Sequence, residues 1–391
     1  MARMLPAIAG DAFVPRLASF YGGLCLAMGV LLPFLSVWFA AKGLNASEIG
    51  FILAAPIVAR IVAVPIVTGL ADRFSALRAV IIVTALATTA SYALVGFADG
   101  FWPILFAVAL ASAAFASLLP LTDTYALQGL GRRGRAYGPV RLWGSAAFIV
   151  GNIATGLVFD HISALHLIWV VVGAFALAAA VAFALPPLDA DAAEARPRRS
   201  ARVLLRSPGF LVVIVGASLV QASHGLYYGF STLAWTAAGL SGSLIGFLWG
   251  LGTFSEIFLF ALSGRLPPVF GPTMLLILGA AGGALRWTIM AFDPPVAALP
   301  LLQCLHAVSF GATHLGAVFY IARAAPKELA ATAQGYLSIG IGVATSGAVA
   351  LAGVMFGAFG TSAYLFMGAM AFAGGGFAFI AHRLRHGESP A

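Results

Sequence analysis

The chain has 391 residues, of which 61% are hydrophobic and only 9% are charged, with a mean hydropathy of +1.01. About a quarter of the residues in a soluble domain are charged, so this composition excludes an ordinary soluble fold. Repeated apolar runs of roughly 20 residues match the hydrocarbon core of a bilayer. The net charge of +8 therefore predicts basic loops beside a membrane rather than nucleic-acid binding.

Charged, glycine–proline and short polar stretches divide the chain into twelve apolar segments. The segments lack the alternation of barrel strands, and backbone groups in lipid must pair within their own element, which predicts helices and an all-α membrane protein. The expected spans are 13–40, 47–70, 78–97, 102–126, 138–160, 164–185, 209–236, 243–264, 272–291, 296–322, 329–355 and 360–384. We expect the first span to be retained, because no signal-peptide cleavage pattern precedes it.

The 21 lysine and arginine residues predict the orientation. With a cytoplasmic N-terminus, the outer loops hold Lys42 alone, three arginines lie within spans, and every other basic residue is cytoplasmic. An even number of spans then leaves both termini in the cytoplasm. Residues 186–208 are rich in proline and charge, which predicts a cytoplasmic linker between two six-helix bundles, 1–185 and 209–391.

Two stretches half a chain apart are near-copies. SEIGFILAAPIVAR covers Ser47–Arg60 and SLIGFLWGLGTFSE covers Ser243–Glu256, so both begin with Ser-x-Ile-Gly-Phe and end on an ionisable residue. Both point the same way across the membrane, which predicts a parallel repeat about the membrane normal. The repeat places Arg60 and Glu256 at matching depths.

Ionisable side chains within membrane spans are costly, and they usually face a cavity or a partner. Besides the repeat pair, the spans contain Asp123, Arg141, His224, Arg286, His306 and His314. Helical spacing adds Tyr228 to the His224 face and Trp249 to the Glu256 face. Together these groups predict a polar cavity; the alternative is a set of hydrogen bonds that pack the helices together.

The charges and rings inside the spans suggest a ligand class. The predicted spans contain three arginines and two carboxylates. When both acids are ionised, one positive charge remains without a partner, and a small organic anion would pair with it. Trp143, Trp249 and Tyr228 would suit an aromatic or a sugar ring.

Metal and cofactor chemistry has no counterpart in the sequence. Cys25 and Cys304 both fall within apolar runs, where packing thiols are expected. His306 and His314 are eight residues apart rather than the four of a helical zinc site. We therefore expect neither an enzyme nor a bound metal or cofactor.

Asp72 and Arg73 follow the second span in the sequence GLADRF. Asp72 can cap the third helix and pair with a cytoplasmic arginine. We predict a cytoplasmic latch here that breaks and re-forms as the two halves rock.

Twelve spans, two parallel halves, a basic linker and GLADRF together resemble the major facilitator superfamily over the whole chain. Leu119–Asp123 (LPLTD), Tyr137–Ser145 (YGPVRLWGS) and Gln221–Phe230 (QASHGLYYGF) look like the 3-phenylpropionic acid transporter family. That family is related to the lactose permease group of proton symporters.

The resemblance implies roles for individual residues. Asp123 and Arg141 match the substrate-binding acid and arginine of the lactose permease pattern. Glu256, Arg286 and either His306 or His314 match its acid, arginine and histidine on later helices. In the lactose permease pattern a carboxylate on the tenth helix is central to proton coupling. This chain has no carboxylate on its tenth span. Glu256, Asp123 or a histidine would then carry the proton.

The sequence therefore predicts a proton-coupled importer of small aromatic carboxylates in a bacterial inner membrane, working as a monomer by alternating access. We expect Glu256 and Asp123 to act in proton coupling, Asp72 and Arg73 in gating, and Arg60 in charge balance. The expected substrate-binding residues are Asp123, Arg141, Trp143, His224, Tyr228, Trp249, Arg286, His306 and His314. The alternatives are a symporter or exporter of sugars or nucleosides, or a membrane sensor or enzyme that transports nothing.

Overall fold

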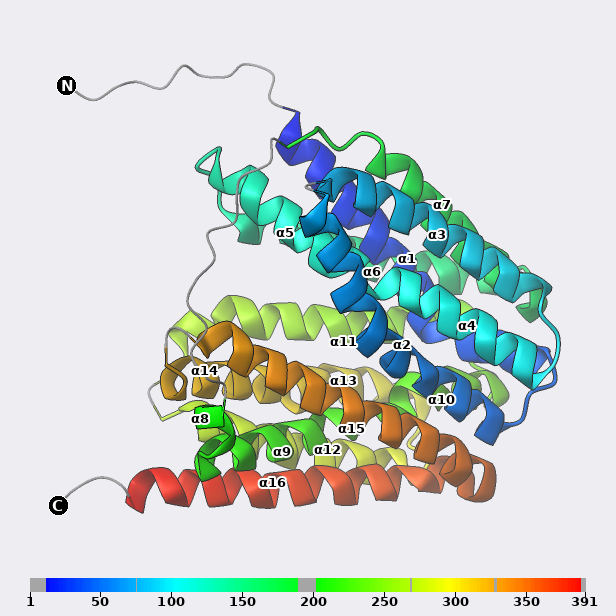
Figure 1. Ribbon diagram of the computed structural model, residues 1–391. Helices are drawn as coiled ribbons and strands as arrows, with labels where there is room; N and C mark the ends of the chain where they lie inside the picture. The colour runs from blue at the N-terminus through cyan, green and yellow to red at the C-terminus, as the bar shows by residue number, and fades with distance from the viewer. Residues whose placement is uncertain (1–11, 75, 189–201, 268, 327–328, 388–391) are drawn as a thin grey trace, which may run out of the picture.

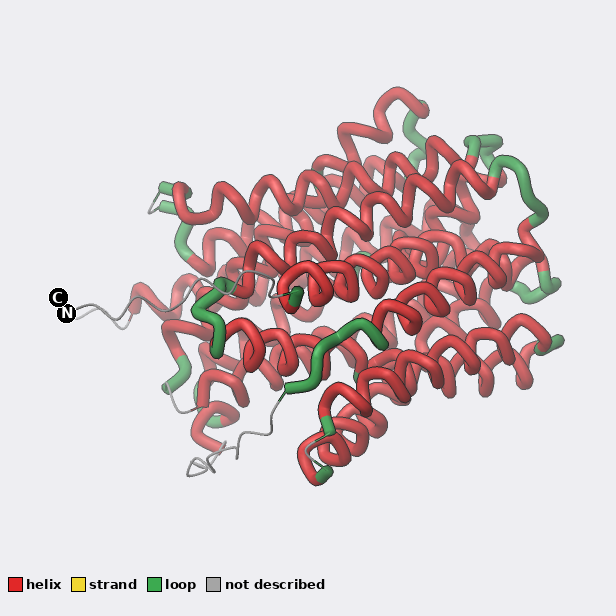
Figure 2. Tube along the Cα trace, turned by 90° about the horizontal axis from the view of Figure 1, so that it is seen from above, coloured by secondary structure: helices red, strands yellow, loops and turns green. Residues whose placement is uncertain are grey.

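The computed structural model describes residues 12–74, 76–188, 202–267, 269–326 and 329–387, and every regular element in them is a helix (Figure 2). Most of the predicted linker, 189–201, and the side chain of the predicted gating residue Asp72 lie outside the described part. The second predicted gating residue, Arg73, is exposed in the last turn of α2.

The helices follow the predicted spans closely. In the first half of the chain they are α1 (Phe13–Ala41), α2 (Ala46–Arg73), α3 (Leu77–Phe97), α4 (Phe101–Ala116), α5 (Leu118–Gly131), α6 (Tyr137–Phe159), η1 (Ala164–His166) and α7 (Leu167–Ala182). In the second half they are α8 (Arg202–Leu205), α9 (Pro208–Ala222), α10 (Gly225–Ala237), α11 (Gly242–Leu262), η2 (Ser263–Arg265), α12 (Pro272–Met290), η3 (Val296–Ala298), α13 (Leu299–Cys304), η4 (Ala307–Ala312), α14 (Thr313–Ala324), α15 (Ala330–Phe359), η6 (Gly360–Ala363) and α16 (Tyr364–Gly387).

Ten stretches of the described chain are long and apolar enough to cross a membrane, and α2 adds two shorter apolar helices. One of the ten, Thr332–Leu384, covers most of both α15 and α16 and therefore corresponds to the last two predicted spans. Large apolar side chains such as Phe106 and Phe372 are more than half exposed. In water such a surface would aggregate, whereas a bilayer covers it. The chain is an all-helical membrane protein, as predicted.

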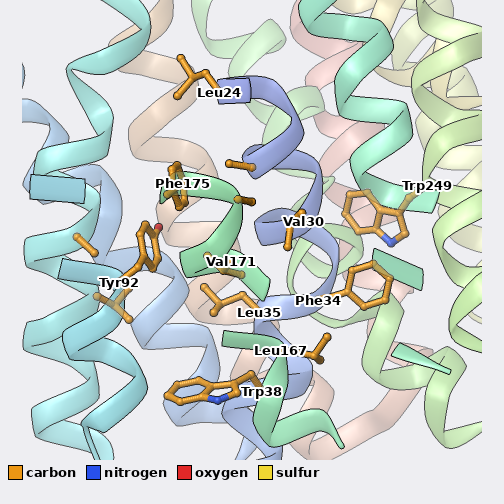
Figure 3. Close-up of a cluster of buried hydrophobic side chains, with 14 of the residues drawn as sticks. Leu24, Val30, Phe34, Leu35, Trp38, Tyr92, Leu167, Val171, Phe175 and Trp249 are labelled. Carbon is orange, nitrogen blue, oxygen red and sulfur yellow. The ribbon is translucent and has the colours of Figure 1, made fainter. Parts of the chain in front are cut away.

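Helix α1 is the centre of the first half (Figure 3). It is apolar on all sides, as expected of a helix surrounded by others, and packs against α6, α7 and α10. Near its end the Trp38 indole donates to the Leu165 carbonyl at 3.2 Å. Beside it, the Tyr92 ring on α3 stacks on Phe175 of α7 with centroids 4.9 Å apart.

Three predicted spans are interrupted, which the apolar pattern did not reveal. The first breaks between α4 and α5, because Pro120 lacks an N–H and its ring crowds the carbonyl of Ala116. The second breaks between α9 and α10 at Ser223 and His224. The third contains the π-helix η4 between α13 and α14. Such π segments often occur at functional sites, and both later breaks carry polar residues.

The two halves of the chain meet through α2 against α15 and through α6 against α11. The glycine of each repeat lies at one of these crossings. A Cβ on Gly50 would lie 2.8 Å from the Cα of Gly353, and one on Gly246 would overlap the carbonyl oxygen of Asn152. Only glycine permits this approach. We call this end of the molecule the α2/α11 end; α1 begins and α16 ends at the opposite end (Figure 1).

Asp160 adds a polar contact at the α2/α11 end. Its carboxylate, just after α6, accepts hydrogen bonds from the backbone N–H groups of Gly242 and Ser243 in the first turn of α11. The positive end of the helix dipole favours this anion. Desolvation raises the pKa of Asp160, but the hydrogen bonds from Ser243 and Gly242 outweigh it and lower the pKa below its ordinary value.

Replacing either repeat glycine should hold the α2/α11 end open. The Cβ atom of Ala46 and that of a residue substituted for Gly357 would lie 3.5 Å apart, which is within the range of a disulfide. In a chain with Cys25→Ser and Cys304→Ser, Ala46→Cys and Gly357→Cys should therefore cross-link on oxidation. Overpacking costs about 1–3 kcal/mol, so Gly50→Leu or Gly246→Leu should lower the cross-linked fraction roughly tenfold.

Gly173→Leu on α7 is the matched control, because a Cβ there meets no atom within 4 Å. Cross-linking that is equally strong in all three leucine variants would contradict the role of the repeat glycines.

Asp160→Ala should expose the start of α11. Loss of a carboxylate at a helix N-terminus costs about 0.5–2 kcal/mol, so amide hydrogen exchange at Gly242 and Ser243 should accelerate roughly 2- to 30-fold. Asp293→Ala, in a loop where the carboxylate accepts from Thr361, is the control and should leave these amides unchanged.

The lowered pKa of Asp160 also predicts the pH dependence of this contact. A group with a depressed pKa stabilises the contact above its ordinary value, about 3.9 for aspartate, and loses that effect only as pH falls through the lowered pKa. Protection of the Gly242 and Ser243 amides, corrected for intrinsic exchange rates, should therefore stay constant from pH 8 to pH 5. A loss within that range would contradict the assignment.

Candidate functional site

Arg286 on α12 is fully buried and held on several sides. Its guanidinium donates to Gln303 Oε1 at 2.8 Å and to His306 Nδ1 at 3.1 Å. The rings of Tyr227 and Trp287 lie over it, with centroids 4.7 and 4.6 Å from Cζ, and aromatic faces attract a cation. Arg286 is therefore fixed by protein groups, which satisfy a charge that would otherwise be costly at this depth.

The contact with Arg286 determines which nitrogen of His306 carries the proton. Arginine can only donate, so Nδ1 of His306 must accept and the ring proton lies on Nε2. Nε2 faces Glu256 Oε2 at 3.6 Å, too long for a hydrogen bond but close enough that a small shift would form one. A carboxylate thus lies beside an imidazole N–H, which is an arrangement suited to proton transfer.

His224, at the break between α9 and α10, extends this network. Its Nδ1 lies 3.2 Å from the carbonyl oxygens of Val220 and Gln221, so Nδ1 carries the proton. Nε2 then accepts from the Ser309 hydroxyl at 3.1 Å, and Ser309 in turn lies 3.5 Å from Nη1 of Arg286. We call Gln221, His224, Glu256, Arg286, Gln303, His306 and Ser309 the α12 cluster.

Three predicted binding residues lie around the α12 cluster in different roles. Trp249 is only 3% exposed; its indole donates to Thr232 and its ring stacks on Tyr227, so it packs α10 against α11. Tyr228 is half-buried and its ring stacks on His224. His314 is exposed one helical step beyond the cluster, parallel to the ring of Phe310.

Asp123 and Arg141 lie together in the first half of the chain. Asp123 Oδ1 accepts hydrogen bonds from the hydroxyls of Tyr21 at 2.6 Å and Tyr137 at 2.8 Å. Arg141 lies with Nη1 3.8 Å from Cys25 Sγ and with its guanidinium 5.5 Å from the centre of the Tyr21 ring. The carboxylate is therefore held by two phenols, and among the described residues it makes no ion pair with Arg141.

A cavity of about 330 Å³ lies between the two halves of the chain. Its walls come from α1 to α5 on one side and from α10 and α15 on the other. Most lining side chains are apolar, and Tyr228 lies at its boundary with the α12 cluster. Arg60 is the single charged residue among its lining residues.

The structure thus groups most of the predicted residues but not all of them. His224, Glu256, Arg286 and His306 meet in one cluster, and Asp123 and Arg141 in another. Trp143 is 63% exposed in a groove on the outer faces of α1 and α6 and joins neither.

The sequence prediction missed Tyr21, Tyr137 and Ser309. Tyr137 precedes Arg141 by one helical turn, a spacing that places both on one face and was available from the sequence. Tyr21 and Ser309 meet their partners across helices, and no sequence periodicity encodes such contacts.

Comparisons with known proteins agree with this architecture. Residues 16–367 match the model of the MFS_1 like family. A probable 3-phenylpropionic acid transporter of Escherichia coli is 33% identical over 84% of this chain and 87% of its own length. A maltose permease of Geobacillus stearothermophilus is 30% identical over 83% of each chain.

Among solved structures, the nucleoside transporter NupG superposes with a TM-score of 0.80 over 95% of this chain and 98% of its own, at 15% identity. That similarity shows the fold alone. The family match and the similarity to two transporters extend over most of the chain. The chain therefore belongs to the MFS_1 like family of the major facilitator superfamily and is a secondary transporter rather than an enzyme.

Proposed function

We propose that this transporter couples proton movement to the uptake of small aromatic carboxylates across a bacterial cytoplasmic membrane. The observation that carries the proposal is the pairing of the buried charges. Among the described residues, Asp123 is held by two tyrosines and Glu256 faces His306, so neither carboxylate forms an ion pair with an arginine. The positive charge of the arginines is therefore left for an anionic substrate.

The cavity supports an aromatic body for the proposed substrate. Its size, about 330 Å³, lies at the small end of ligand pockets. Leucine, valine and phenylalanine supply eight of its seventeen lining residues, and methionine, proline and alanine add three more apolar ones. A polyhydroxylated sugar would leave its hydroxyl groups unpaired against such walls, whereas a phenyl ring would be favoured.

The α12 cluster supports proton coupling. With Glu256 ionised, its negative charge lies beside His306, and through His306 it stabilises the charge of Arg286. A proton on Glu256 would remove that negative charge and leave the site more attractive to an anion. By linkage, a bound anion would favour the proton equally. Symport of a proton with an anionic substrate follows from this reciprocity.

Substrate competition tests the ligand class. Proteoliposomes with an imposed pH gradient, acidic outside, should accumulate labelled 3-phenylpropionate and lose that uptake when the gradient is collapsed. Unlabelled 3-phenylpropionate in 100-fold excess should compete, while maltose, lactose and a nucleoside should not. Competition by a sugar or the nucleoside would favour the alternative of a sugar or nucleoside symporter. The absence of any flux across the panel would contradict the proposed substrate class and the sugar and nucleoside alternatives alike.

Glu256→Gln tests the coupling role separately. Glutamine keeps the shape of the side chain but cannot release a proton, so exchange of labelled for unlabelled 3-phenylpropionate without a gradient should persist. Uphill accumulation should be abolished. Asp293→Asn, which removes a carboxylate from an exposed loop where it accepts from Thr361, is the comparison variant and should retain accumulation. Normal accumulation by Glu256→Gln would contradict the proposed coupling.

A further inference from the structure

Arg60 has a different environment from the other two arginines within the spans. Leu53, Pro56 and Arg60 follow one another at three- and four-residue spacing on α2, and all three line the cavity between the halves. This spacing places them on one face of the helix. The Arg60 side chain is exposed, and it forms no hydrogen bond or ion pair with the residues that the structure describes.

The other two arginines are less available to a ligand. Arg286 is fully buried, and Gln303 and His306 accept its hydrogen bonds. Arg141 lies against Cys25 and Tyr21 and does not line this cavity. Arg60 therefore combines free guanidinium donors with access to the cavity, and an unpaired charge at such a depth usually marks a substrate or ion path.

The repeat sharpens the contrast. Arg60 and Glu256 each lie ten residues beyond a repeat glycine, about 15 Å along the helix. Glu256 contacts His306, so the charge of Arg60 is not used to balance it. Apolar residues of α1 and α4, including Leu31, Leu35 and Phe115, line the same cavity as Arg60.

We propose that Arg60 binds the carboxylate of the substrate while the apolar wall of α1 and α4 receives its hydrocarbon body. This inference rests on the proposed function, because it takes the substrate to be an aromatic carboxylate. A guanidinium presents two parallel N–H donors that match a carboxylate. Tyr228 on the same cavity stacks on His224 of the α12 cluster, so the bound substrate lies next to the groups that we assign to coupling.

Two ligands that differ only in the head group test the assignment. Binding of 3-phenylpropionate and of the neutral 3-phenylpropan-1-ol should be measured on the full chain in nanodiscs by calorimetry. The wild type should prefer the carboxylate. Arg60→Gln should weaken carboxylate binding roughly 10- to 100-fold, the range for a hydrogen bond to a charged group. Binding of the alcohol should change little, which also shows that the variant is folded.

Two further variants serve as controls. Arg60→Lys keeps the charge and should retain part of the preference. Arg265→Gln removes an exposed arginine in η2, away from the cavity, and should leave both affinities unchanged.

The outcomes separate this inference from the proposed function. A wild type that shows no preference for the carboxylate would contradict the proposed substrate class before any variant is made. A wild type with the preference and an Arg60→Gln variant that keeps it would overturn the role of Arg60 alone. Equal losses of both ligands in Arg60→Gln would assign a structural role to Arg60 and overturn the inference as well.

Discussion

The approach of two backbones at each repeat glycine is the contact on which the rest of the structure depends. At Gly50 against Gly353, and at Gly246 against Asn152, no side chain separates the helices. The halves of the chain therefore meet closely at the α2/α11 end, where Asp160 also bonds to the start of α11. On α2 the lining of the cavity starts at Leu53, less than one helical turn beyond the Gly50 crossing. An alternating-access cycle would have to separate these same surfaces, which are held by packing, by the two hydrogen bonds of Asp160 and by the hydrogen bond that the Ser346 hydroxyl donates to the Ala54 carbonyl.

The charged interior follows the rule that buried polar groups need partners. Arg286, Ser309, His224 and His306 form a connected chain of hydrogen bonds, while Nε of Arg286 has no partner among the described residues. Such a chain is rigid, because moving one member leaves another unpaired in a medium of low dielectric constant. The breaks at His224 and in η4 make it possible, since regular helices through these points would orient the two histidines differently.

Much of this was accessible from the sequence. Apolar runs predicted the helices, and the duplicated Ser-x-Ile-Gly-Phe led to Arg60 and Glu256, although the role of its glycines, Gly50 and Gly246, was not predicted. What remained hidden were the partners. Gly353 and Asn152 have no motif of their own, and the Tyr21 hydroxyl reaches Asp123 across 102 positions of the chain. The break near Pro120 follows from the missing N–H of proline, which is visible in the sequence. The break at His224 and the π-helix depend on tertiary contacts.

The opposite charges at the matched positions of the repeat fit a division of labour between the halves. A duplicated helix places two side chains at similar depth in the two halves of the chain, and identical charges at that depth would repel each other. An arginine in one copy and a glutamate in the other avoid that repulsion. They also differ in chemistry: arginine stays charged and suits an anion, while a carboxylate can gain and lose a proton. Because Glu256 contacts His306 instead of Arg60, its protonation need not break the ion pair that would hold a substrate. Coupling between the two sites would then act through Tyr228, which lines the cavity and stacks on His224, rather than through a direct salt bridge.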